Sequence, residues 1–116
     1  MTLIFETGIH VVESDMRIEN ISELTMLSNG TISTIACNES SNLIRFETIG
    51  YVQINALEFI GCSNRFEAVN QLLIINTSFI GSGHMDGTAL LFIESNITIT
   101  LSNFSNNHGG LSLIHI

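Results

Sequence analysis

Two cysteines are the residues whose chemistry is easiest to state in this chain. Cys37 and Cys62 are separated by about one period of the internal repeat described below. In an exported chain this spacing favours a disulfide between neighbouring repeats, and the alternative is a pair of buried, reduced thiols. The sequence has no CxxC motif and no histidine at ligand spacing, so we predict no metal site and no cofactor.

The asparagines suggest a second kind of chemistry, N-glycosylation. Six Asn-x-Ser/Thr sequons occur, whereas chance would give about 2.4. They begin at Asn20, Asn29, Asn38, Asn76, Asn96 and Asn103. Turns rich in Asn, Ser and Thr produce some sequons as a by-product, but the excess favours an extracellular or cell-surface glycoprotein. The opening MTLIFETGIHVV has no basic region and no cleavage site, so we expect the signal peptide to lie upstream.

Acid–base catalysis has little support. Glycoside hydrolysis uses two or three carboxylates held together, and lyases use a calcium-binding acid cluster beside a basic residue. The two aspartates, Asp15 and Asp86, are far apart, and the glutamates are dispersed. The turn HMDG (84–87) is the one possible acid–base pair, and we predict no catalytic residue. We interpret four scattered histidines as structural or surface residues: His10, His84, His108 and His115.

The charge balance excludes some partners. Three arginines, Arg17, Arg45 and Arg65, stand against eleven acidic residues, for a net charge of −8. Nucleic acids and anionic membrane surfaces attract clustered Lys and Arg, so neither is an expected partner. No apolar run reaches the roughly 18 residues that a membrane-spanning helix needs. We interpret the arginines as isolated surface residues, solvated or paired.

An internal repeat carries these residues. Three segments align without gaps: YVQINALEFIGC (51–62), QLLIINTSFIGS (71–82) and NITITLSNFSNN (96–107). Each has an aliphatic residue, an Ile two positions later, and a Phe five positions after that. The members are Val52/Ile54/Phe59, Leu72/Ile74/Phe79 and Ile97/Ile99/Phe104. A degraded earlier copy is expected at Leu24/Met26, one repeat before Val52.

The repeat predicts short strands. Alternation of apolar and polar residues indicates a strand with one buried face, and the Phe after a polar bend indicates a second strand. A third apolar stretch lies between copies, at 43–46, 67–69 and 89–93. A chain that climbs one strand spacing per unit and stacks like residues on like is a parallel β-helix. We therefore predict an all-β solenoid of about four to five coils.

A leucine-rich-repeat solenoid is the alternative fold. Ile21-x-x-Leu24-x-Met26-x-x-Asn29 fits the LxxLxLxxN core of that repeat. Leu57 and Thr77 stand where later copies would need the asparagine, and the recurring Phe is unexplained. These departures favour the β-helix.

Short motifs also carry a family resemblance. FSNN (104–107) followed by GG (109–110) resembles the FxxN and GGA[ILV] signature of polymorphic outer-membrane proteins. It is also similar to animal surface proteins with the right-handed, pectin-lyase-like β-helix, and LIFETGIH (3–10) resembles the LxFxxGxH start of such a domain. Earlier copies carry Gly61 and Gly81 near the signature asparagine, so the signature is complete only once. The resemblance implies a right-handed parallel β-helix at the cell surface.

The last six residues, LSLIHI (111–116), have a separate interpretation. They are the translation of ctg tct ctt ata cac atc, which resembles the end of a transposase adaptor used in short-read libraries. A natural final strand is the alternative, since the run alternates with Ser112 and His115. We predict a partial β-helix domain over 1–110 and a non-native tail over 111–116, so that the chain is a fragment.

The functional prediction follows from these observations. We expect a non-enzymatic, structural or adhesive module that presents an elongated face to an extracellular protein or glycan, and that packs against further coils of the same chain. The alternative is a fragment of a polysaccharide lyase or glycoside hydrolase whose catalytic coils lie outside this segment.

Overall fold

The computed structural model describes residues 1–37, 43–81, 88–105 and 110–114. These residues form twelve strands and no helix, which confirms the prediction of an all-β chain. The strands are β1 (Thr2–Phe5), β2 (Gly8–Val12), β3 (Met16–Ser28), β4 (Ser33–Cys37), β5 (Leu43–Asn55), β6 (Leu57–Ile60), β7 (Ser63–Ile75), β8 (Ser78–Ile80), β9 (Thr88–Ile93), β10 (Ile97–Thr100), β11 (Asn103–Ser105) and β12 (Gly110–Ile114).

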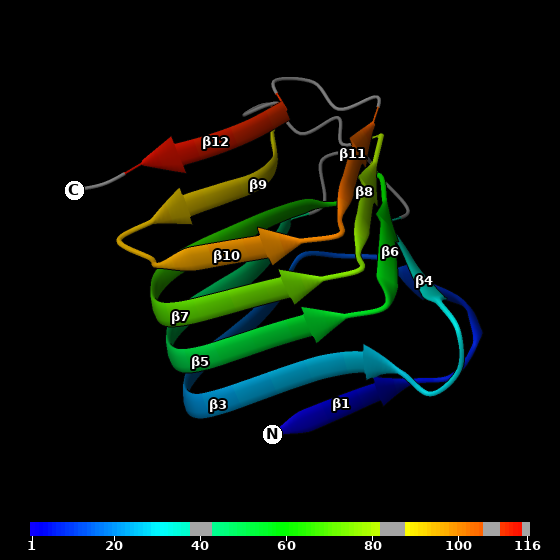
Figure 1. Cartoon of the computed structure of the whole chain (residues 1–116), viewed down its shortest axis with the longest axis horizontal. Helices are drawn as coiled ribbons and strands as arrows, with labels where there is room; N and C mark the ends of the chain where they lie inside the picture. The colour runs from blue at the N-terminus through cyan, green and yellow to red at the C-terminus, as the bar shows by residue number, and fades with distance from the viewer. Residues whose placement is uncertain (38–42, 82–87, 106–109, 115–116) are drawn as a thin grey trace.

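The strands build two parallel sheets, and the chain passes back and forth between them (Figure 1). Sheet A has the order β1-β3-β5-β7-β9-β12, and β10 also pairs with β7. Sheet B has the order β11-β8-β6-β4-β2. The leucine-rich-repeat alternative places a helix or 3₁₀ turn opposite its strands. A second parallel sheet occupies that place in the described residues, so the structure does not have that architecture.

The long strands of sheet A are bent in the middle. Their bends lie at Asn20 in β3, Thr48 in β5 and Ala68 in β7, each with a positive φ between 54° and 58°. Pairing between β3 and β5, and between β5 and β7, continues on both sides of each bend. In Figure 1 the ribbons of these strands curve back behind the sheet. The bends give each strand two legs that face in different directions.

One sequence expectation about strand boundaries is wrong. The apolar stretches at 43–46 and 67–69 were expected to be separate short strands, but the first belongs to β5 and the second to β7. The third, 89–93, lies in β9 and is separated from β10 by Glu94, which also has a positive φ. In β3, β5 and β7 a single left-handed residue changes the chain direction without a loop, and strand pairing resumes directly after it.

The strand register confirms the predicted repeat. Val52 pairs with Leu72, and Leu72 pairs with Ile97, as the alignment of the three segments predicts. The repeated phenylalanines Phe59, Phe79 and Phe104 are register partners in the same way. The degraded copy is also in register, because its Leu24 and Met26 pair with the corresponding residues of β5. Unequal repeat lengths are absorbed between the strands, so like side chains still stack.

Stacked side chains fill the space between the sheets. One core cluster contains the buried repeat residues, and its largest members are aromatic. The rings of Phe46 and Phe66 stack with centroids 4.5 Å apart. Phe79 lies between Phe59 and Phe104, at 5.1 Å and 5.2 Å, with the rings nearly parallel. Such offset pairs add about 0.5–1.5 kcal/mol to the burial of the rings.

The β1 end of the stack is less covered. Leu3, Phe5, Val12 and Ile18 pack against the core cluster but are only partly buried. At the other end, part of the suspected tail forms β12, which pairs with β9 in parallel. Pairing does not reveal the origin of a segment, so the non-native tail stays a prediction.

Candidate functional surface

The structure joins the two cysteines in a disulfide. Cys37 ends β4, and Cys62 follows β6, the neighbouring strand in sheet B. Their Cα atoms lie 5.2 Å apart, and the bond links residues separated by 25 positions. The disulfide therefore ties two successive passes of the chain through sheet B.

The sequons are spread over the outside of the molecule. Among the described residues, five sequon asparagines are exposed: Asn20, Asn29, Asn76, Asn96 and Asn103. Asn38 lies outside the described residues. Asn20 and Asn76 occupy bends with positive φ, a conformation that Asn tolerates better than most residues. Asn29 is held at its corner because its Oδ1 accepts a hydrogen bond from the backbone of Thr7 at 3.1 Å.

Asp15 and His10, two of the residues considered for chemistry, make structural contacts. In the described segments, no three His, Cys, Asp or Glu side chains are placed to hold a metal ion. Asp15 accepts a hydrogen bond from the backbone N–H of Leu43 at 2.9 Å. His10 packs edge-on against Phe5, and its Nε2 lies 2.7 Å from the carbonyl oxygen of Glu6. His84, Asp86, His108 and His115 are outside the described residues, so the predicted lack of a catalytic site stays a prediction.

The arginines are paired at the surface, as one of the two predicted outcomes, but the prediction that they are isolated from one another is wrong. Arg17, Arg45 and Arg65 are register neighbours on β3, β5 and β7, and they form one column. A second column, two residues further on, holds Glu19, Glu47 and Glu67. We call the two columns the Arg–Glu face. The arginines recur with the same period as the repeat residues Leu24, Val52 and Leu72, so the signal was present in the sequence.

Ion pairs cross between the two columns. Glu47 forms ion pairs with both Arg17 and Arg45, at 3.7 Å and 4.0 Å, and Arg65 pairs with Glu67 at 3.4 Å. An open hollow of about 410 Å³ lies at the β3 end of this face, lined by Asp15, Met16, Arg17 and Arg45. The pairs are partly exposed, so each stabilises the fold only weakly.

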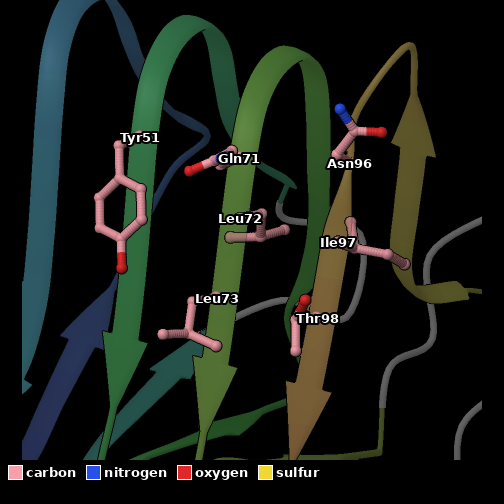
Figure 2. A pocket seen from close by; sticks show the side chains of 7 residues that line it. All are labelled: Tyr51, Gln71, Leu72, Leu73, Asn96, Ile97 and Thr98. Atoms are coloured by element: carbon pink, nitrogen blue, oxygen red, sulfur yellow. The ribbon is translucent and has the colours of Figure 1, made fainter.

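A second hollow, of about 290 Å³, lies on the outer side of sheet A (Figure 2). Its lining comes from β5, from β7 and from the start of β10: Tyr51, Gln71, Leu72, Leu73, Asn96, Ile97 and Thr98. Buried Leu72 belongs to its floor, while Gln71, Asn96 and Thr98 are exposed. We call this the Tyr51 hollow. It combines an aromatic ring with amide and hydroxyl groups.

Hydrogen bonds fix two side chains of the Tyr51 hollow. The Tyr51 hydroxyl donates to Oε1 of Gln53 at 3.3 Å, so the ring lies along the sheet. Nδ2 of Asn96 donates to the backbone carbonyl of Asn70 at 3.2 Å. Tyr51 was not predicted as a site residue from the sequence. Strand alternation could have placed it on the outer side, because it precedes the buried Val52.

No family model, curated protein or solved structure matches this chain. The part of the chain that the structure describes contains no helix long and apolar enough to cross a membrane. The case for a function therefore rests on the residues and their arrangement.

Proposed function

We propose that the chain is part of a right-handed parallel β-helix at the cell surface or in the extracellular space. Its role is structural or adhesive and not enzymatic, and its outer faces meet an extracellular protein or glycan. Further coils of the same chain pack against its ends.

The observation that carries this proposal is the register of like residues. Columns such as Leu24–Val52–Leu72–Ile97 repeat one side-chain type on neighbouring parallel strands. Each pass of the chain through sheet A, sheet B and back to sheet A adds one such layer, which is how a solenoid is built. A crossover between parallel strands of one sheet is almost always right-handed, which supports that hand.

Two further observations support an exported scaffold. A disulfide between Cys37 and Cys62 is typical of oxidising compartments. Five sequon asparagines are exposed among the described residues, as glycan acceptors must be.

Antibody staining tests the location. An antibody raised against the recombinant chain should stain intact, unpermeabilised cells that carry the native gene, or detect the protein in their medium. Treatment with peptide N-glycosidase should increase the electrophoretic mobility of the native protein. Signal that appears only after permeabilisation, with unchanged mobility, would contradict export.

Incubation with polysaccharides tests the non-enzymatic role. The native protein should bind a subset of surface glycans or matrix proteins without releasing reducing ends or unsaturated uronates. Product release from uronate-containing or neutral polymers would instead assign the protein to the carbohydrate-active enzymes.

A further inference from the structure

We propose that the Tyr51 hollow binds the protein's own N-linked glycan, which is attached at Asn96. The hollow would bind the two N-acetylglucosamine residues next to the asparagine, and the sugar would cover the Tyr51 ring. This inference rests on the proposed export of the chain.

Asn96 is placed to carry a sugar into the hollow. It immediately precedes β10, its side chain is exposed, and it lines the hollow together with Thr98, the hydroxyl residue of its sequon. Its Nδ2 has two hydrogens, and the hydrogen bond to the Asn70 carbonyl uses one of them. The other position is free for the glycosidic bond. The bond to Asn70 can therefore persist after glycosylation and keep the side chain oriented.

Tyr51 lies within reach of the first two sugars. β5 and β10 pair with β7 on opposite sides of its second leg, where Tyr51 is the register partner of Gln71 and Asn96 precedes the partner of Leu72. Tyr51 and Asn96 are therefore two strand spacings apart, about 10 Å. A disaccharide laid across β7 spans that separation. Figure 2 shows Gln71 on β7 between Tyr51 and Asn96, with Leu73 further along the same strand.

The chemistry of the hollow suits an N-acetylated sugar. A pyranose ring has an apolar face of C–H groups that packs on an aromatic ring, and Tyr51 offers a half-buried ring fixed by its bond to Gln53. The exposed Gln71 amide lies beside that ring and can bond to the hydroxyl and acetamido groups of the sugar. An apolar surface with a few polar groups is the usual composition of a small-molecule site.

The sequon at Asn103 provides a matched comparison. Asn103 is also exposed and also lies on an outer strand position, but in β11 of sheet B. Its register neighbour on β8 is Ser78, followed on β6 by Glu58. Neither neighbour is aromatic, so a glycan there has no comparable surface.

Tyrosine fluorescence can test the proposed glycan site directly, because Tyr51 is the only tyrosine and the chain has no tryptophan. The chain is secreted from eukaryotic cells behind an added signal peptide, and occupancy at each sequon is measured by mass spectrometry. Quenching of Tyr51 by acrylamide is then compared among wild type, Asn96→Gln, Thr98→Val and Ser105→Ala. Two different substitutions remove the Asn96 sequon, so an effect common to both comes from the lost glycan.

We expect the quenching constant of wild type to be roughly two-fold lower than that of Asn96→Gln and Thr98→Val, because the sugar covers the exposed side of the ring. Ser105→Ala, which removes the Asn103 glycan, should match wild type. Free N,N′-diacetylchitobiose, added to Asn96→Gln, should protect Tyr51 only at high concentration, since attachment supplies a high effective concentration.

Three outcomes would overturn the inference. If Asn96 is glycosylated but acrylamide quenches Tyr51 equally in all variants, the glycan does not cover Tyr51. The inference is then wrong, while the proposal of an exported scaffold is unaffected. If Asn96 carries no glycan, the proposed glycan site is wrong, and the Asn96 sequon no longer supports export. If free disaccharide protects Tyr51 at low concentration while the attached glycan does not, the hollow belongs to a sugar from another molecule.

Discussion

Replacing Phe79 with alanine should cost about twice the unfolding free energy that the same change costs at Phe104. Phe79 is 1% exposed, and it stacks on one ring at each side, Phe59 at 5.1 Å and Phe104 at 5.2 Å. Truncation of a fully buried phenylalanine costs about 3–5 kcal/mol. Phe104 is only partly buried and its one described ring contact is Phe79, so we expect a loss of about 2 kcal/mol there.

Urea unfolding, followed by far-ultraviolet circular dichroism with the disulfide oxidised, measures both losses. The variant with both Phe79→Ala and Phe104→Ala should lose about 1 kcal/mol less unfolding free energy than the sum of the two single losses. Each single variant already removes the stacking between the two rings. Phe79→Leu keeps most of the buried volume and should lose only about 1–2 kcal/mol, which keeps the comparison possible if the alanine variant does not fold. Equal losses at the two positions, or strict additivity, would refute the idea of one continuous ring column.

Three more predictions concern the bonds and backbone between layers. Reduction of the Cys37–Cys62 disulfide, which closes a sequence separation of 25, should lower the unfolding free energy by about 3.5 kcal/mol, and a loss below about 1 kcal/mol would contradict the tie between layers. Gly50→Ala should cost about 1–3 kcal/mol in the same urea assay, because its Cβ would lie 2.6 Å from the carbonyl oxygen of Ser22; an unchanged midpoint would refute this close approach. Ala56→Asn should raise stability by about 0.5–1 kcal/mol, since Ala56 has a φ of 58° that asparagine adopts more readily, and a loss would argue against that bend.

The vertical organisation of the fold could be predicted from the sequence because it depends on burial. Register partners on successive strands must be side chains of the same kind. This requirement produces a repeated spacing of apolar residues that can be recognised in the sequence. The pairs Leu24/Val52 and Met26/Ile54 were recognisable although the copy around them has decayed. A buried position tolerates few replacements, so its signal outlasts that of the turns.

Most of the bends in sheet A could not be predicted, because only Asn20 among their residues carries a turn signal. Thr48, Ala68 and Glu94 adopt positive φ without being Gly or Asn, so the sequence gives no reason to end a strand there. The strain of each bend is offset by the pairing on both sides. Because of these bends, the sequence predicted two separate strands where β5 and β7 are each one bent strand.

The Tyr51 hollow was missed because it depends on the register of outward residues. Outer positions of a strand are free to vary, so Tyr51, Gln71 and Asn96 show no common type. The alignment of the three repeats puts them at one position, but their side chains do not suggest a common role until the sheet shows the hollow between them. The arginine column differs in this respect, because the spacing of the arginines is that of the repeat and could have been recognised in the sequence.

The Arg–Glu face also restricts where a partner can bind. Neighbouring arginines in a column repel each other by about 1 kcal/mol in water at one strand spacing, and the adjacent glutamates offset this repulsion. The face uses all three arginines and three of the eleven acidic residues, so the rest of the chain carries eight acidic residues and no Lys or Arg. A protein partner that docks elsewhere must therefore be basic or uncharged at the contact, because an acidic one would meet only like charge. The Tyr51 hollow is lined by uncharged residues. A neutral sugar, which is not repelled by the surrounding acidic residues, suits such a surface.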